Sequence, residues 1–359
     1  MEQIQQPKTA MLAKDAGGGM LQCTACRRYC KIPEGWAGFC GVRGNHKGKL
    51  ELVVYGRPAA VWADPVEKKP LFHFLPGTKI YSFGTFGCNF ACDFCQNWDI
   101  SQAPQQFRKQ DPKKWREHFL NLVKQCREMP PEVVVENALA NGCKSIAFTY
   151  NEPTIFTEYA LDVMQVARKK GLKGVYVTNG YEARECWDAM KGLIDAANID
   201  LKAYNNRFYN KLCKAPDYEG VKDSIEYARK LGIWVEVTTL LIPGWNDDEK
   251  ELREEAEWLA SVDKEMPWHV TAFHPDYKLL DKPPTPPETL LKARKIGLEA
   301  GLKHVYCGNL GAEYADYETT FCAGCGKPLV VRHGYRIMGD DVKDGKCKFC
   351  KRKVSGIWN

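Results

Sequence analysis

The stretch that decides the fold class is TFGCNFACDFCQNWDIS, residues 85–101, which holds Cys88, Cys92 and Cys95. A closed thiolate site for zinc or iron takes four donors, so three cysteines leave one position to be filled. As zinc ligands they would need a further donor such as His73. As ligands of a 4Fe–4S cluster they leave one iron without a protein donor, and an open position is what a metal site needs for chemistry. The x3 and x2 spacing favours the cluster.

The cysteine stretch follows the first of a series of strand-like segments. The strand candidates are residues 79–85, 144–150, 173–179, 197–204, 233–242, 268–273 and 303–308. Helical patterns, such as PETLLKARKIGLEAG at 287–301, lie between them. Strands that alternate with helices predict an α/β fold with parallel pairing, either a doubly wound sheet or a barrel.

The side-chain alternation in NIDLK favours the barrel. Asn198, Asp200 and Lys202 share one face of this strand, opposite Ile199 and Leu201. A doubly wound sheet would bury both faces under helices, at a cost of several kcal/mol for each unpaired polar group. A partial barrel turns them into a polar lumen, and its active site lies where the strands end. We therefore expect an open or partial barrel over residues 78–310.

Cys88-x3-Cys92-x2-Cys95, with Phe94 before the last cysteine, resembles the signature of the radical S-adenosylmethionine (SAM) superfamily. The resemblance is closest to the pyruvate formate-lyase activating enzyme branch, through TNG at 178–180, DLK at 200–202 and LLIPGWND at 240–247. It implies a partial (β/α)6 TIM-like barrel of the radical SAM type. It implies that the open iron is chelated by the amino and carboxylate groups of SAM. It also implies reductive cleavage of SAM to a 5′-deoxyadenosyl radical, which removes hydrogen from a substrate.

The resemblance also implies which residues contact SAM, although it identifies no catalytic residue. Glu152 is expected near the SAM amino group and Asp200 near the carboxylate. The branch has Gly-Gly-Glu where this chain has Tyr150-Asn151-Glu152. The full set of SAM-contact candidates is Asn151, Glu152, Asn179, Gly180, Asp200, Lys202 and His274. The alternatives are turn and cap residues, and for Asp200 with Lys202 a salt bridge in the lumen.

Two further cysteine groups flank the barrel. The N-terminal cysteine group is Cys23, Cys26, Cys30 and Cys40; the C-terminal one is Cys322, Cys325, Cys347 and Cys350. Four thiolates suit zinc or an iron–sulfur cluster. Spacing does not separate the two for the N-terminal group, although we prefer structural zinc. The paired Cys-x2-Cys knuckles of the C-terminal group predict a zinc ribbon or rubredoxin-like module.

These features divide the chain into a loose tail (1–20), a four-cysteine module with a lead-in (21–77), the barrel (78–310) and the ribbon (318–359). We expect the lead-in segment, residues 64–77, to lie near the mouth of the cluster site. Five other cysteines are scattered, and Cys307 ends a strand at the expected active-site face. Scattered thiols without an export signal or an apolar span indicate a reducing compartment, and we expect a cytoplasmic protein.

The flanking modules, together with DPVEKKPLFHFLPG (64–77) and FHPDY (273–277), resemble the AmmeMemoRadiSam system radical SAM enzyme family. This implies protein partners from that system and a flavodoxin- or ferredoxin-type electron donor. The alternative is a glycyl radical enzyme activase. A more distant alternative is a non-catalytic zinc scaffold or nucleic-acid-binding protein. The net charge of +6 does not favour nucleic acid, because the basic residues are spread along the chain.

Overall fold

The computed structural model describes residues 8–359; residues 1–7, the start of the expected tail, lie outside the described residues. The chain forms two compact units. The first comprises residues 8–63 and 81–194, and the second comprises residues 64–80 and 195–359. The region expected to form the barrel is therefore shared between the units.

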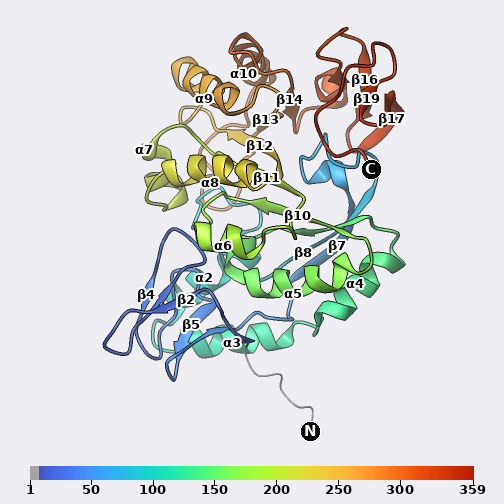
Figure 1. Ribbon diagram of the computed structural model, residues 1–359. Helices are drawn as coiled ribbons and strands as arrows, with labels where there is room; N and C mark the ends of the chain where they lie inside the picture. The colour runs from blue at the N-terminus through green and yellow to red at the C-terminus, as the bar shows by residue number, and fades with distance from the viewer. Residues whose placement is uncertain (1–7) are drawn as a thin grey trace. The chain divides into compact units, whose positions relative to one another are not determined.

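The first unit contains a sheet with the strand order β7-β8-β9-β10. These strands are β7 (Ala60–Pro65), β8 (Lys79–Gly84), β9 (Ser145–Phe148) and β10 (Lys173–Thr178). Its helices are α1 (Trp98–Ser101), α2 (Ala103–Gln110), α3 (Trp115–Gln125), α4 (Pro131–Ala140), η2 (Pro153–Phe156), α5 (Thr157–Arg168) and α6 (Arg184–Ala189). β9 and β10 pair in parallel, and α4 packs beside α5 (Figure 1). The chain thus alternates strand and helix as the sequence predicts.

The N-terminal part of the first unit consists of short antiparallel strands. They are β1 (Lys8–Thr9), β2 (Ala13–Asp15), β3 (Leu21–Cys23), β4 (Lys31–Ile32), β5 (Arg43–His46) and β6 (Lys49–Leu52). β1 pairs with β6 and β2 with β3, so residues 8–15 contribute strands in place of the loose tail. Ala10 and Leu12 are buried, and the amides of Met11 and Leu12 donate to the Glu158 carboxylate. These partners are distant in sequence, which is why the sequence pattern did not show them.

The second unit contains the parallel strands β11 (Ala196–Asp200), β12 (Trp234–Leu241), β13 (Trp268–Ala272) and β14 (Val305–Gly308). The helices between and beside them are η1 (Val66–Lys68), α7 (Asn206–Phe208), η3 (Tyr209–Cys213), α8 (Glu219–Lys230), α9 (Glu249–Val262), α10 (Pro287–Glu299) and η4 (Ala312–Glu318). α9 and α10 lie side by side (Figure 1). Both units thus show the mixed α/β fold with parallel pairing that the sequence predicts.

The polar faces of β11 and β12 are buried and paired with each other. Asn198 and Thr238 exchange side-chain hydrogen bonds of 2.9 and 3.0 Å. Glu236, fully buried, accepts from the ring nitrogen of Trp234 and contacts Nε2 of His269 at 2.7 Å. Asn198, one of the polar residues that favoured a barrel, therefore has a hydrogen-bonded partner, and so does Glu236, as buried polar groups must.

The lead-in segment packs at the amino ends of β12, β13 and β14. Glu236 accepts from the amides of Phe72 and His73 at 2.9 and 2.8 Å. The His73 ring lies 2.7 Å from both the Tyr306 hydroxyl and the Ser355 carbonyl. Both ring nitrogens of His73 therefore have partners within the second unit. The expected position of the lead-in near the cluster mouth stays a prediction.

The C-terminal ribbon, residues 318–359, has its own small core. Its strands are β15 (Thr320–Phe321), β16 (Pro328–His333), β17 (Arg336–Asp340), β18 (Val342–Lys343) and β19 (Lys346–Cys347). The β16–β17 hairpin separates the two Cys-x2-Cys knuckles. Leu329, Val330 and Val342 are buried with Cys322 and Cys347. The ribbon predicted from the cysteine spacing is confirmed as a structural module.

Candidate functional site

The cluster loop, residues 85–101, begins directly after β8 and carries Cys88, Cys92 and Cys95. The amide of Phe90 donates to Cys88 Sγ at 3.3 Å, and Cys95 Sγ lies 3.1 Å from Ser101 Oγ. The sulfurs of Cys88 and Cys95 thus each have a polar partner within the loop. Such contacts suit thiolates that carry negative charge at an iron–sulfur site.

The spacing of these three thiols is wider than that of a single-ion site. Among residues 8–359, the sulfurs of the four ribbon cysteines all lie within 4.8 Å of one another, whereas the sulfurs of Cys88, Cys92 and Cys95 do not. A tetrahedral zinc–thiolate site places its sulfurs about 3.8 Å apart, because each zinc–sulfur bond is about 2.3 Å. A cluster places irons and sulfides between its cysteines, so the observed arrangement fits a cluster better than one zinc ion.

Asn151 fixes the start of the cluster loop. Its Oδ1 accepts from the Thr85 amide at 3.1 Å, and its Nδ2 donates to the Gly87 carbonyl at 2.8 Å and to Thr85 Oγ1 at 3.1 Å. The side chain that we expected to contact SAM is thus occupied by the loop backbone. Asn151 is a positioning residue for the cysteines, and Tyr150 before it adopts a left-handed φ of 69° that turns the chain toward the loop.

Glu152 connects the ends of β9 and β10. The carboxylate is fully buried. Oε1 accepts from the amide and hydroxyl of Thr154 at 3.0 and 2.6 Å, and Oε2 accepts from the amide of Asn179 at 2.9 Å. Asn179 Nδ2 in turn lies 2.7 Å from Asn89 Oδ1 and 3.9 Å from Cys88 Sγ. The structure therefore brings the two predicted residues Glu152 and Asn179 together with the first cysteine of the cluster loop.

A second buried carboxylate, Glu182, shares a partner with Glu152. The Thr178 hydroxyl lies 2.9 Å from Glu152 Oε1 and 2.5 Å from Glu182 Oε1, and also accepts from the amide of Gly180. Because a hydroxyl has one proton, Thr178 can donate to only one of the two carboxylates at a time. Burial raises the pKa of Glu152 above its ordinary value, against the lowering effect of its hydrogen bonds. Sequence reasoning missed Thr178 and Glu182, although TNGYE carried both.

The remaining predicted SAM contacts lie in the second unit. Asp200 ends β11, and its Oδ2 forms a 2.8 Å ion pair with Lys202 Nζ. This is the salt bridge that the sequence left as an alternative, and both side chains stay partly exposed. Asn246 holds the Lys202 carbonyl at 2.7 Å. His274 is exposed, two residues after β13, with a weak 3.4 Å contact to the Pro275 carbonyl.

The scattered cysteines that the structure describes are mostly core residues. Cys143, Cys186, Cys213 and Cys307 are buried. Cys307 Sγ faces the Leu290 carbonyl at 3.6 Å, and burial raises the pKa of its thiol to about 12. A buried thiol with a raised pKa is inert, so Cys307 packs β14 against α10.

The ribbon cysteines form a compact four-sulfur set. The ligand atoms of Cys322, Cys325, Cys347 and Cys350 all lie within 4.8 Å of one another. Two of the sulfur pairs, Cys322–Cys350 and Cys325–Cys347, are 3.5 and 3.8 Å apart. These are the edge lengths of a tetrahedral metal–thiolate site.

The sequence of this chain matches one family model and is similar to several known proteins. The family model for the Radical SAM superfamily matches residues 83–256. Uncharacterized protein MJ0808 of Methanocaldococcus jannaschii is 41% identical over 350 residues, which cover 97% of this chain and 98% of that protein. MJ1632 of the same organism, provisionally named a glycyl-radical enzyme activating enzyme, is 26% identical over 230 residues, 62% of this chain and 78% of that protein.

Among solved structures, a radical SAM methyltransferase from Sphaerobacter thermophilus aligns with a TM-score of 0.49 and 15% identity, over 71% of each chain. In the part of the chain that the structure describes, no helix is long and apolar enough to cross a membrane.

Proposed function

Because this chain belongs to the radical SAM superfamily, we propose that it is an enzyme that cleaves SAM reductively at Cys88, Cys92 and Cys95. A 4Fe–4S cluster with SAM on its open iron supplies, when bound, a 5′-deoxyadenosyl radical able to remove hydrogen from a substrate. The observation that carries the proposal is a set of three widely spaced thiols beside a buried carboxylate. The first thiol, Cys88, contacts the Asn179 side chain, and the Asn179 amide donates to Glu152.

The residues of the first unit have separate tasks in this proposal. Asn151 positions the cluster loop through Thr85 and Gly87. Glu152 would accept the SAM amino group, since Oε2 accepts a hydrogen bond from the Asn179 amide and a carboxylate oxygen can accept two. Asn179 and Gly180 hold the end of β10 against that carboxylate. In water-excluded surroundings these polar contacts are strong, and a radical is shielded.

Asp200, Lys202 and His274 are proposed for the SAM carboxylate and the methionine portion. Lys202 supplies a cation for a carboxylate, and its pairing with Asp200 orients it. His274 is exposed and carries a ring nitrogen for a polar ligand group. These assignments follow the resemblance of DLK (200–202) to the pyruvate formate-lyase activating enzyme branch and of FHPDY (273–277) to the AmmeMemoRadiSam family.

We further propose a physiological context and a metal for the ribbon. The substrate is handled with the partner proteins of the AmmeMemoRadiSam system, and a flavodoxin- or ferredoxin-type donor supplies electrons. The ribbon holds zinc, for which its sulfur separations of 3.5 and 3.8 Å have the right size. Activation of a glycyl radical enzyme is the second candidate, favoured by the likeness to MJ1632.

The test is reductive cleavage of SAM by anaerobically reconstituted protein. We expect dithionite-reduced wild type to form 5′-deoxyadenosine and methionine, and Cys92→Ala to lose at least 100-fold of that rate, on the order of the loss expected for removing a ligand of the reactive metal. Cys143→Ala, which removes a buried thiol outside all three cysteine groups, is the matched control and should keep the rate. Wild type that forms no 5′-deoxyadenosine while holding a full cluster would refute the proposal. A glycyl doublet in a partner enzyme after incubation would select the activase candidate.

A further inference from the structure

We propose that Cys23, Cys26, Cys30 and Cys40 hold a second iron–sulfur cluster, redox-active and adjacent to the cluster loop, in place of the structural zinc preferred in the sequence analysis. The existence of this cluster is independent of the proposed function. Its role as an electron-transfer centre for SAM cleavage rests on the proposed function.

The separation of the thiols is the first observation. In the ribbon the four ligand sulfurs all lie within 4.8 Å of one another, as one tetrahedral ion requires. Among residues 8–359 the N-terminal cysteine group does not meet this criterion, and neither does the cluster loop. The same chain therefore holds one compact cysteine set and two wide ones. The wide N-terminal set resembles the cluster loop in this respect and differs from the ribbon.

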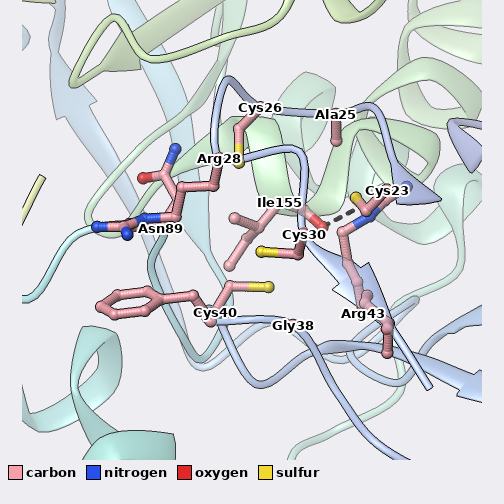
Figure 2. Close-up of a pocket in the computed structure, with 12 residues that line it drawn as sticks. Cys23, Ala25, Cys26, Arg28, Cys30, Gly38, Cys40, Arg43, Asn89 and Ile155 are labelled. Atoms are coloured by element: carbon pink, nitrogen blue, oxygen red, sulfur yellow. Dashed lines mark hydrogen bonds between the residues drawn. The ribbon is translucent and has the colours of Figure 1, made fainter. Parts of the chain in front are cut away.

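The second observation is a cavity between the four thiols. All four cysteines line it, together with Ile32, Ile155 and Gly38 (Figure 2). Cys23, Cys26 and Cys40 are buried, and Cys30 is partly exposed. A cluster of irons and sulfides needs space between its four thiols, and this cavity offers it. Apolar walls also suit a cluster, because burial and solvent exclusion set its potential.

The third observation is a buried cation aimed at a sulfur. Arg43, 1% exposed, donates from Nε to Cys23 Sγ at 3.2 Å. The rest of its guanidinium forms a two-bond ion pair with Glu158, with distances of 2.6 and 2.8 Å. Hydrogen bonds to cysteine sulfur are among the groups that tune the potential of a cluster. The ion pair with Glu158 holds Arg43 in this orientation without an unpaired buried charge.

The N-terminal cysteine group contacts the cluster loop on both sides of Cys88. A Cβ at Gly87 would lie 2.6 Å from the Cys40 carbonyl oxygen, so the two backbones touch there. Arg28 Nε donates to the Asn89 carbonyl, and Asn89 also lines the cavity. Cys40 and Arg28 thus contact the residues immediately before and after Cys88. A cluster in the cavity would therefore lie next to the cluster loop, whose residue Asn89 also lines the cavity.

The chemistry of such a centre is one-electron transfer. An external donor of the flavodoxin or ferredoxin class loses one electron, and the cluster gains it. No bond forms or breaks at the four cysteines, and no proton needs to move. Zinc has no redox chemistry, so the two metals predict different behaviour on reduction.

The experiment counts metals in full-length protein purified without oxygen. In the triple variant Cys88→Ala/Cys92→Ala/Cys95→Ala, the cluster loop cannot hold iron. We expect this variant to keep roughly four irons and four sulfides per chain, and to show an electron paramagnetic resonance signal after dithionite reduction. Adding Cys30→Ala should remove this iron and the signal but leave the ribbon metal. Two zincs and no iron in the triple variant would overturn the proposal.

Wild type and single variants keep the test decisive if the triple variant does not fold. Wild type should hold roughly eight irons, and Cys30→Ala alone should hold roughly four. Cys350→Ser should lose only the ribbon metal, and Cys143→Ala should lose nothing. Wild type with four irons, unchanged by Cys30→Ala, also overturns the second cluster. Failure of SAM cleavage with eight irons present would instead contradict the proposed function, so the two failures are distinguishable.

Discussion

At the residue scale, Glu255 of α9 is a buried acid whose hydrogen-bond partner is the neutral hydroxyl of Thr239. It is 1% exposed, and its Oε1 lies 2.5 Å from Thr239 Oγ1, which accepts from the Trp268 ring at 2.9 Å. Burial raises the pKa of Glu255 to about 8, with nearby Glu251 adding to the effect. The folded protein therefore keeps this carboxyl protonated at neutral pH, whereas the unfolded chain releases the proton near pH 4.5.

This pKa predicts a stability that falls as pH rises. A raised folded pKa gives stability that is fully present below about pH 4.5 and is lost as pH rises through about 8. Glu255→Gln keeps the acceptor for Thr239 and removes the titration. We expect its free energy of unfolding to exceed that of wild type by a margin that grows from pH 4.5 to pH 8, reaching about 1 to 4 kcal/mol. Chemical denaturation at several pH values measures this margin.

The control is Glu257→Gln, which changes an exposed carboxylate on the same helix. It should track wild type at every pH. Because both variants are compared with wild type, other titrating groups cancel, including His73, whose pKa burial lowers to about 3. A constant difference between Glu255→Gln and wild type from pH 4.5 to pH 8 would show that Glu255 is ionised in the folded protein.

At the element scale, the turn at the start of the cluster loop, just after β8, depends on Gly87. Its φ of 89° lies in the left-handed region that favours glycine. A Cβ there would lie 2.6 Å from the Cys40 carbonyl oxygen and 2.9 Å from Val42. Both neighbours belong to the segment that carries the N-terminal cysteine group, and backbone cannot move aside as a side-chain end can. The turn and that segment therefore hold each other in place.

Gly87→Ala should combine a conformational cost with a steric one. A left-handed φ costs a non-glycine residue roughly 1–2 kcal/mol, and the clash with Cys40 adds to it. We expect a total loss of about 2–4 kcal/mol in unfolding free energy, together with faster loss of iron to a chelator. Gly142→Ala is the matched control, since Gly142 has a φ of 70° and nothing within 4 Å of an added Cβ. Equal losses in the two variants would mean that the backbones do not constrain each other.

The sequence predicted the strands and helices better than the contacts between them. Each of the seven strand candidates corresponds to one of the strands β8 to β14, because alternating strand and helix patterns are local signals. Glu152 and Asn179 were found as ends of such strands. The hydrogen bonds of Asn151 and Thr178 could not be predicted, because they join residues that are 66 and 26 positions apart. Likewise, the sequence spacing of the N-terminal cysteines does not reveal the distances between their sulfur atoms.

At the scale of the whole molecule, the second unit joins distant parts of the chain. The lead-in segment precedes the first parallel strand of this unit, β11. It is hydrogen-bonded to the C-terminal ribbon. Leu75 donates its amide to the Ile357 carbonyl and Ile357 donates to the His73 carbonyl, both at 2.7 Å. Arg332 of β16, 1% exposed, donates to the Phe72 carbonyl at 2.6 Å. The ribbon thus fixes the segment that in turn supplies two amides to Glu236.

Removal of the ribbon metal should therefore loosen the lead-in segment as well as the ribbon. A module this small depends on its metal for folding energy, and without it the bonds to Leu75 and Ile357 lose their partners. We expect Cys350→Ser to speed amide hydrogen exchange at Leu75 and Ile357 at least tenfold, since a loss of about 1.4 kcal/mol suffices for that factor. Cys126→Ser, a partly exposed thiol outside the ribbon, should leave these rates unchanged. If the amides of Cys322 and Gly326 exchange freely in Cys350→Ser while Leu75 stays protected, the ribbon and the lead-in segment fold independently, and Glu236 needs no help from the chain end to hold its amide donors.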